Sequence, residues 1–275
     1  MRTTHRLILF GLILTTLIIF TYAYNKTFTG KVIQQERANV TRVIDGDTVE
    51  VDLAGSKEKI RLLGINTPEI KQPYHDQARD FLREKIEGKE VVLERGNENK
   101  DKYSRLLRFI FLGKEFINEE VLQEGFANFY EYTPTSYTQQ LKKAEESARN
   151  QGKNIWGKST DTCASCITLS KIQKGKDNCK AGEEYIEFKN TCSFDCDLTG
   201  WTLKDDASHI YKFASSLPGK NSLQLYSGQG YDQIAERIFF YQNKDKCASV
   251  WNQDKDSVFL RDSQGKLAFY SHYQN

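Results

Sequence analysis

Residues 40–69 constrain the fold of this chain more than any other stretch, and their sequence is VTRVIDGDTVEVDLAGSKEKIRLLGINTPE. The stretch contains three short strand-like runs, Val40–Ile44, Thr48–Leu53 and Lys59–Leu63. An Asp-Gly turn and an Ala-Gly-Ser turn separate these runs, which is the pattern of a β-meander. Because tight glycine turns fold such strands back on one another, we expect polar residues at the strand ends to converge on one cleft.

The segments after the meander complete a small barrel. Strand-like runs occur at Val91–Arg95 and Leu106–Leu112, and His75–Glu87 has the apolar spacing of a helix that Gly88 ends. Five strands with an inserted helix predict a Greek-key barrel of the oligonucleotide-binding (OB) type.

Two more helices are expected beside this barrel. One covers Asn118–Glu124, and a capping box at residues 136–139 is expected to open the other, which runs through Asn150. Ile155 and Trp156 are expected to dock as the last core residues.

Charged and amide side chains cluster at the strand ends of the meander. Carboxylate and amide oxygens suit a hard divalent cation, an arginine suits a phosphate, and a further glutamate suits a general base. Each residue alone also has a structural explanation, because Asp-Gly turns and surface arginines are common; their joint occurrence favours a site. The cluster comprises Asp45, Asp47, Arg61, Asn66 and Glu69.

Three motifs in this order, DGDT, RLLGINTPE and DKYSR at Asp101–Arg105, resemble those of the thermonuclease (staphylococcal-nuclease-like) family over residues 38–157. The resemblance implies an endonuclease that hydrolyses phosphodiester bonds of single-stranded or frayed DNA and of RNA. It further implies Ca²⁺ as the cofactor and 3′-phosphate ends on the products.

The resemblance implies a metal site made of the Asp47 carboxylate, the Asn66 side-chain oxygen and the Thr67 backbone carbonyl. The family commonly has Asp at the position of Asn66, so this chain lacks one negative charge there. Because calcium affinity follows ligand charge, we expect weaker binding, which Asp45 would partly offset.

The resemblance also assigns roles around the substrate. Glu69 matches the general base, and Arg61 and Arg105 match two arginines that grip phosphate oxygens. The remaining matches contact the bound strand. Lys102 and Tyr103 match residues that contact a terminal phosphate, and Tyr130 and Tyr132 match a pair against which a base stacks.

Net charge gives these expectations no support, although the formal value for the whole chain is +2. Residues 38–158 carry 20 basic and 21 acidic side chains, and residues 159–275 carry 14 and 15. A nucleic acid must therefore be held by locally placed cations and not by a broad positive field. No histidine pair, H-E-x-x-H or phosphate-binding G-x-x-x-x-G-K sequence points to another nuclease mechanism.

The chain begins with a targeting or anchoring segment. Arg2 and Arg6 precede the apolar run Leu7–Tyr24, which is close to the length needed to span a bilayer. Thr21–Ala23 offers a cleavage site, so the segment is either a removed signal peptide or a membrane anchor. In both cases the rest of the chain is expected outside the cytoplasm, secreted or anchored in the cytoplasmic membrane by residues 7–24.

Short strand-like runs with regular turn signals dominate the second half and predict a β-sandwich, so the fold class is α+β with an all-β second domain. The Gly200-Trp201 strand, the turn at residues 217–220, the Trp251-Asn252 step and the final turn at residues 262–265 resemble the immunoglobulin-like lamin-tail domain in order. We expect this domain to act in targeting or adhesion, with an unknown ligand.

The expected divisions are residues 1–24 (signal or anchor), 25–37 (tether), 38–158 (barrel), 159–180 (connector) and 181–275 (sandwich).

All cysteines follow residue 162, and an even number in one segment of an exported chain favours disulfides. A structural zinc site is the alternative, because Cys163 and Cys166 form a C-x-x-C pair.

The alternative to catalysis is an extracellular scaffold that binds nucleic acid or protein without turnover, which Asn66 and the balanced charge favour.

Overall fold

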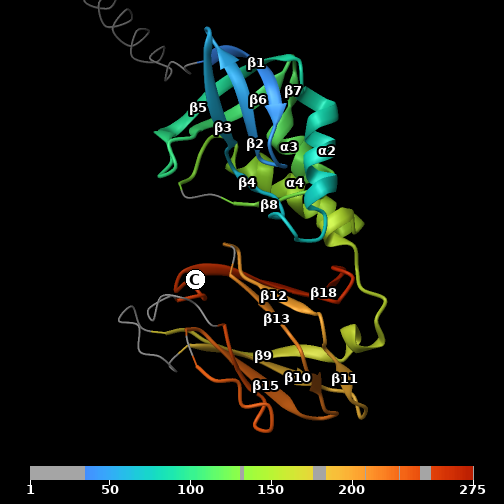
Figure 1. Ribbon diagram of the computed structural model, residues 1–275. Helices are drawn as coiled ribbons and strands as arrows, with labels where there is room; N and C mark the ends of the chain where they lie inside the picture. The colour runs from blue at the N-terminus through green and yellow to red at the C-terminus, as the bar shows by residue number, and fades with distance from the viewer. Residues whose placement is uncertain are drawn as a thin grey trace, which may run out of the picture.

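The computed structural model has two bodies, a barrel with helices and a β-sandwich, that lie one above the other (Figure 1). The expected N-terminal segment at residues 7–24 and most of the tether lie outside the described residues. Within the described ranges no helix combines the length and apolar character needed to cross a bilayer. The structure describes residues 35–130, 133–175, 184–207, 209–228, 230–241 and 249–274.

The first body is a closed five-stranded barrel, as predicted. Antiparallel neighbours run in the order β3-β2-β1-β5-β6, and a parallel pairing of β3 with β6 closes the barrel. A short pair, β4 with β8, lies at the end of the barrel that faces the sandwich (Figure 1). The strands are β1 (Gln35–Val43), β2 (Thr48–Leu53), β3 (Ser56–Leu62), β4 (Ile65–Asn66), β5 (Glu90–Lys100), β6 (Leu106–Leu112), β7 (Glu115–Phe116) and β8 (Asn128–Phe129).

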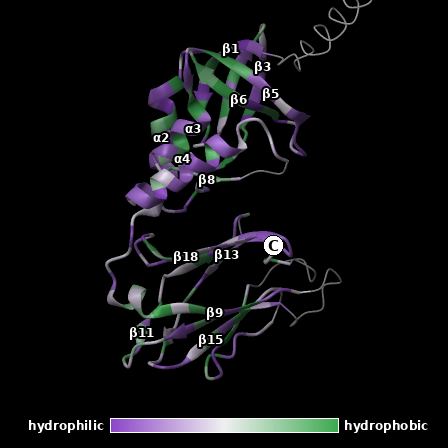
Figure 2. Cartoon of the chain, turned by 180° about the vertical axis from the view of Figure 1, so that it is seen from behind, coloured by the Kyte–Doolittle hydropathy of each residue, from purple (hydrophilic) through white to green (hydrophobic). Residues whose placement is uncertain are grey.

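Three helices pack against this barrel: α2 (His75–Ile86), α3 (Ile117–Gln123) and α4 (Thr138–Gln151). Their apolar faces join the barrel core, and hydrophilic residues cover much of α2 and α4 (Figure 2). The predicted capping box was wrong, because the residue before α4 makes no side-chain cap hydrogen bond. Instead, the backbone N–H of Thr135 donates to Oγ1 of Thr138.

The second body has two four-stranded sheets, β16-β15-β10-β9 and β13-β12-β17-β18, and a short pair, β11 with β14. The sheet containing β12, β13 and β18 faces the barrel domain (Figure 1). The structure differs from the expected connector, because residues 167–173 form β9 and pair with β10. The strands are β9 (Ile167–Gln173), β10 (Tyr185–Asn190), β11 (Cys196–Asp197), β12 (Thr202–Lys204), β13 (Ile210–Lys212), β14 (Ser216–Leu217), β15 (Ser222–Tyr226), β16 (Ile238–Phe240), β17 (Lys255–Arg261) and β18 (Leu267–Gln274).

Four cysteines form two disulfides near the start of the sandwich domain. Cys163 bonds to Cys196, and Cys166 bonds to Cys192. Both members of the C-x-x-C pair are therefore joined to other cysteines, which confirms the disulfide interpretation for these four. Cys179 and Cys247 lie outside the described residues.

An apolar cluster joins the two bodies. Trp156 is 1% exposed and packs against Phe259 and Tyr270, with ring centroids 6.0 and 5.3 Å away. The backbone N–H of Leu267 also donates to the Gly157 carbonyl, at 2.8 Å. Ile155 and Trp156 thus belong to a cluster shared with the sandwich and not to the barrel core, where they were expected.

Candidate active site

A cleft of about 670 Å³ opens where the ends of β2 and β3 meet the loops after β4 and β5. Most of the residues predicted for the site line this one cleft, together with Asp45 and Asp101. Thr67 does not line it and is buried. The predicted residues that line the cleft are Asp47, Arg61, Asn66, Glu69, Lys102, Tyr103, Arg105 and Tyr130.

Asp47 organises the corner between the first turn of the meander and the loop after β4. Its carboxylate accepts hydrogen bonds from the Thr67 backbone N–H at 3.0 Å and from the Thr48 hydroxyl at 3.0 Å. The preceding Gly46 is required here, because an added Cβ would lie 2.8 Å from side-chain atoms of both Thr67 and Ala78. The Asp-Gly-Asp sequence therefore permits a close approach that places Asp47 against Thr67.

Asp45 and Asp47 bring two carboxylates to the same corner. The backbone N–H of Asp47 donates to Oδ1 of Asp45 at 3.0 Å. Burial, followed by the negative charge of Asp47, raises the pKa of Asp45 to about 6. A divalent cation would relieve this repulsion, so two carboxylates with nearby neutral oxygens fit a hard, oxygen-preferring ion such as calcium.

The candidate metal corner is poor in charge. Across the residues that the structure describes, no three His, Cys, Asp or Glu side chains are arranged to hold a metal ion. The Asn66 side-chain oxygen accepts a hydrogen bond from Arg61 at 3.3 Å, so it faces the same corner as Asp47. The calcium site expected at this corner, and the effect of Asn66 on its affinity, stay predictions.

Arg61 is held by three hydrogen bonds and one ion pair. Its Nη1 donates to the carbonyl oxygens of Leu62 and Ile65, at 2.6 and 2.9 Å. Its Nη2 lies 3.0 Å from Oδ2 of Asp47 and also donates to Asn66. Both terminal nitrogens of the Arg61 guanidinium are thus engaged by protein atoms.

Arg105 is held by fewer protein groups. Its Nε donates to Asp101 at 2.7 Å, and its Nη1 donates to the Thr48 hydroxyl at 3.2 Å. Burial acts to raise the pKa of Asp101, but hydrogen bonds from the Arg105 side chain and from nearby backbone N–H groups outweigh it and lower that pKa. Asp101 therefore fixes Arg105, and among the described residues Nη2 has no acceptor.

The other predicted residues lie around the opening. Glu69 is exposed on the cleft wall, and Tyr103 is 68% exposed. The Tyr103 ring has the Lys102 ammonium 5.1 Å from its centroid and the Arg105 guanidinium 5.5 Å away. Tyr130 lines the same cleft, whereas Tyr132 lies outside the described residues. The catalytic and binding roles of these residues stay predictions.

The sandwich domain contributes to the wall of this cleft, which the sequence did not predict. Ala207 and His209 line it, and Nδ2 of Asn66 donates to the Ala207 carbonyl at 3.4 Å. A hydrogen bond to Asp205, with Nδ1 and Oδ2 2.6 Å apart, raises the pKa of His209. Because 141 positions separate Asn66 from Ala207, no local signal identifies this contact.

Comparisons with known proteins identify the families to which the two domains are similar. The family profile described as Staphylococcal nuclease homologue matches residues 59–158, and that of the Lamin Tail Domain matches residues 161–274. The chain is 38% identical to a thermonuclease of Staphylococcus hyicus over 129 residues, which is 44% of this chain and 76% of the relative. It is 37% identical to a thermonuclease of Staphylococcus intermedius, over 45% and 78% of the two chains. It is also 36% identical to the endonuclease YncB of Bacillus subtilis, over 46% and 65%.

Proposed function

Since this chain belongs to the family of staphylococcal nuclease homologues, we propose that it is a calcium-dependent endonuclease that hydrolyses DNA and RNA and leaves 3′-phosphate ends. One observation carries the proposal: Asp47, Arg61, Glu69 and Arg105 come from four separate segments and line a single cleft. The thermonucleases to which the barrel domain is similar support the same activity.

Each residue of the cleft has a separate role in this proposal. Arg105, through the donor that no described residue occupies, grips a non-bridging phosphate oxygen and stabilises the charge that grows in the transition state. Arg61, held by Asp47 and two carbonyl groups, fixes the corner and adds positive charge beside the phosphate. Glu69, exposed on the wall, accepts a proton from the attacking water. Tyr130 presents a ring on which a base stacks.

Asp45, Asp47 and the oxygens of Asn66 and Thr67 would hold the calcium ion. When bound, calcium would neutralise phosphate charge and polarise the phosphorus centre. The charge-poor donor set accounts for the weak affinity that we propose.

We also propose that the protein works outside the cytoplasm. Two disulfides support this, because such bonds persist mainly in oxidising compartments. The apolar run at residues 7–24 supports it as well, as a signal or as an anchor. An unidentified ligand of the sandwich domain would then be extracellular or part of the cell envelope.

The activity is tested with purified protein and end-labelled single-stranded DNA, first with calcium and then with a chelator. We expect calcium-dependent internal cleavage, with products that require phosphatase before 3′ extension. Glu69→Gln should abolish turnover without changing the unfolding midpoint, and Glu84→Gln, at an exposed position on α2, is the matched control. Cleavage that persists in chelator would refute the metal role. Tight binding without turnover would identify a binding scaffold instead.

A further inference from the structure

A second concavity, the interdomain groove, lies between the barrel and the sandwich and has a volume of about 470 Å³. On the barrel side it is lined by the loop after β4, including Pro68, Ile70 and Lys71. On the sandwich side it is lined by β12, β13 and the end of β17. The proposed activity uses no residue of this groove except Asn66.

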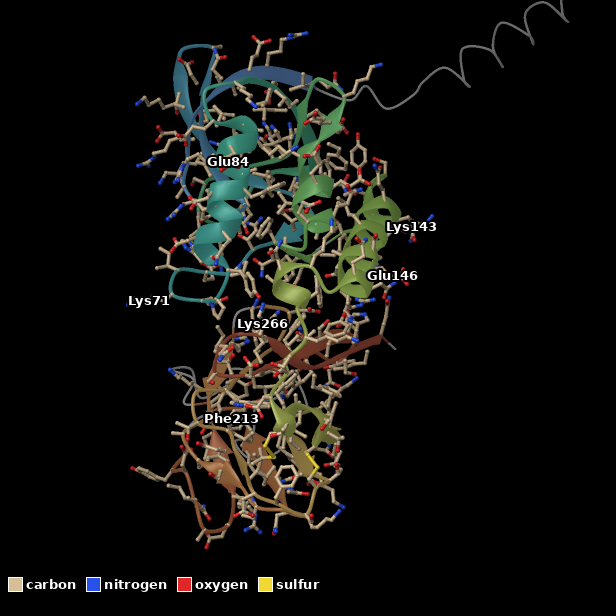
Figure 3. The ribbon with its side chains drawn as sticks, turned by 90° about the vertical axis from the view of Figure 1, so that its right-hand side faces the viewer. Lys71, Glu84, Lys143, Glu146, Phe213 and Lys266 are labelled. Carbon is tan, nitrogen blue, oxygen red and sulfur yellow. A yellow bond between two sulfur atoms is a disulfide. The ribbon has the colours of Figure 1, made fainter. Side chains whose placement is uncertain are left out.

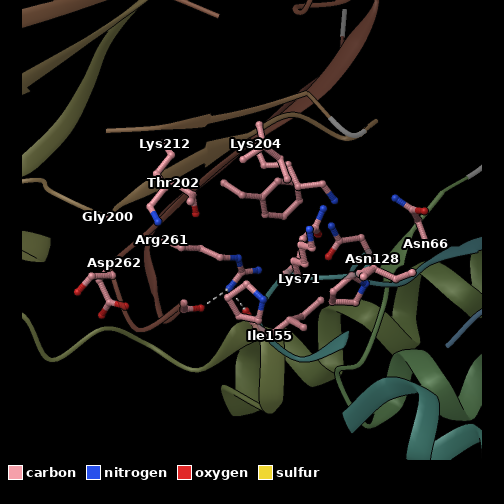
Figure 4. Close-up of a pocket in the computed structure, with 18 residues that line it drawn as sticks. Asn66, Lys71, Asn128, Ile155, Gly200, Thr202, Lys204, Lys212, Arg261 and Asp262 are labelled. Carbon is pink, nitrogen blue, oxygen red and sulfur yellow. Dashed lines mark hydrogen bonds between the residues drawn. The ribbon is translucent and has the colours of Figure 1, made fainter. Parts of the chain in front are cut away.

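Four cations line the groove: Lys71 from the barrel, and Lys204, Lys212 and Arg261 from the sandwich (Figure 4). Asp262 is the one acidic residue among the described residues that line it. Its oxygens already accept hydrogen bonds from the Ser159 hydroxyl and from two backbone N–H groups. The groove therefore concentrates positive charge in a protein whose two halves are almost neutral.

These cations are not neutralised in pairs by the described part of the protein. Burial lowers the pKa of Lys204, so nearby carboxylates do not fully compensate its ammonium charge and a bound anion would favour the charged form. Arg261 donates to the Ile155 and Gly265 carbonyls, which are neutral acceptors. Lys71 and Lys212 are exposed, and within the described ranges neither side chain makes an ion pair. An anion in the groove would meet several unmatched positive charges.

The groove also offers apolar and hydrogen-bonding contacts suited to bases. Ile70 and Ile210 are 72% and 38% exposed and both line it, so two large apolar side chains face solvent there. Asn128 is 6% exposed, and its Oδ1 has no hydrogen-bond partner among the described residues. A buried acceptor of this kind matches an amino or hydroxyl donor on a ligand.

The groove continues directly from the cleft. Asn66 lines both, and it is the register partner of Asn128 in the β4–β8 pair. Along the next residues of the loop, Glu69 lines the cleft while Pro68 and Ile70 line the groove. The hairpin between β12 and β13 of the sandwich also lines both: His209 lines the cleft, and the next residue, Ile210, lines the groove.

We propose that the interdomain groove holds the continuation of the nucleic-acid strand whose scissile phosphate lies in the cleft. The lamin-tail domain is then part of the substrate-binding surface: Lys204, Lys212 and Arg261 contact phosphates, and the isoleucines and Asn128 contact bases. This inference rests on the proposed nuclease function. We choose a single-stranded nucleic acid as the ligand because it presents both phosphates and unstacked bases. The groove offers cations for the phosphates and apolar side chains for the bases.

The test compares the full chain with the triple variant Lys71→Ala, Lys204→Ala, Lys212→Ala. The matched control removes three exposed lysines elsewhere, Lys114, Lys143 and Lys189, and Figure 3 places Lys143 on the side of the barrel domain opposite Lys71. Binding of a long oligothymidylate is measured by fluorescence anisotropy in chelator at several salt concentrations. Cleavage of the same oligonucleotide and of a thymidine dinucleotide is measured with calcium.

We expect the groove variant to bind the long strand about tenfold more weakly at low salt. The slope of log affinity against log salt should fall in magnitude by roughly 0.7 for each phosphate that the variant no longer neutralises. Its cleavage of the dinucleotide should equal that of the full chain, because the dinucleotide does not reach the groove. The control variant should retain the binding and the salt slope of the unaltered chain.

Three results would overturn the inference. The first is unchanged oligothymidylate binding by the groove variant, and the second is a loss of dinucleotide cleavage as large as the loss of long-strand cleavage. The third is polyglutamate binding as tight as that of the oligonucleotide, which would indicate a general polyanion surface. The binding measurement needs no turnover. If no variant cleaved any substrate, the proposed nuclease function would be refuted, and the comparison of oligothymidylate affinities would still show whether the groove binds the strand.

Discussion

At the scale of single residues, the two arginines of the cleft differ in how many protein groups they satisfy. Arg61 donates to two backbone carbonyls and to the Asn66 side chain, and it forms an ion pair with Asp47. Among the described residues, Arg105 is held by Asp101 and Thr48, through two of its nitrogens. The same residue type therefore serves mainly to build the corner in one case and to meet the substrate in the other.

We predict separate consequences for the two arginines. Arg105→Ala should lower turnover about 10²–10³-fold with little change in stability, because it removes a donor to the transition state. Arg61→Ala should lower turnover and also reduce the free energy of unfolding by about 3 kcal/mol, because it leaves Asp47 buried without its cation. Urea unfolding beside steady-state cleavage checks both, and equal destabilisation by the two variants would contradict the distinction.

Asn66 lies at the border of the cleft and the groove, where it is a candidate calcium ligand and also contacts the sandwich domain. Asn66→Asp should tighten calcium binding about tenfold, because affinity follows ligand charge. The same change removes the donor to the Ala207 carbonyl and should weaken the contact between the domains. Calcium titration calorimetry checks the first effect, and limited proteolysis between the domains checks the second. Unchanged calcium affinity would exclude residue 66 from the metal site.

At the scale of elements, α4 carries a buried carboxylate toward β8 and the sandwich. Glu145 accepts a hydrogen bond from the Phe129 backbone N–H at 2.8 Å. Burial raises the pKa of Glu145 to about 7, and the negative charge of Asp206 acts in the same direction. Burial also raises the pKa of Asp206 to about 6. Two acids of different domains are thus harder to ionise in the folded protein than in water.

We predict that stability falls as these acids ionise. Because the folded-state pKa of Glu145 lies above its ordinary value of 4.5, its stabilising effect is complete below about pH 4.5 and is lost as the pH rises through 7. Glu145→Gln should raise the free energy of unfolding at pH 8 by up to about 3 kcal/mol and change it little at pH 4.5. Urea unfolding at both pH values measures this. Glu146→Gln, at the exposed neighbouring position (Figure 3), should have no such pH-dependent effect.

At the scale of the whole molecule, the two domains share a buried aromatic cluster and a set of polar contacts. Trp156 packs against Phe259 and Tyr270, which also contact each other. The Arg149 guanidinium lies 5.6 Å from the Trp156 ring centroid and 5.0 Å from that of Tyr270. The ammonium of Lys266 donates to the Tyr74 hydroxyl at 2.7 Å, between the two bodies (Figure 3). This interface brings the sandwich to the cleft and forms the groove.

We predict that Trp156 couples the unfolding of the two domains. Trp156→Ala should reduce the free energy of unfolding by about 3–5 kcal/mol, because it leaves a cavity in the shared cluster. The single cooperative transition expected of the full chain should then separate into two, seen by circular dichroism and tyrosine fluorescence. Phe194→Ala, at an exposed aromatic of the sandwich, should leave one transition. One transition in the Trp156 variant would show that other contacts carry the coupling.

Local patterns were enough to predict most elements of the barrel. β2 and β6 have the predicted limits, and α2 and α3 are within one residue of theirs, because apolar spacing and glycine turns act over a few residues. β9 was not predicted because it lies in a polar segment that was expected to be a connector, and it is fixed by pairing with β10. The capping box predicted at residues 136–139 was wrong, because α4 begins at Thr138 without a side-chain cap and the Thr138 hydroxyl accepts from the Thr135 backbone N–H.

The α+β class, the order of barrel and sandwich, and most residues of the cleft could be read from the amino-acid sequence, because they depend on short-range patterns and on motifs recognised as a set. Long-range packing set the rest. It gives Arg61 three hydrogen bonds and an ion pair with Asp47. It also places Ala207 and His209 on the cleft wall and Lys71 in one groove with lysines of the sandwich. These juxtapositions join positions far apart in the chain, and the cluster around Trp156, together with polar contacts such as Lys266 to Tyr74, holds the two domains together.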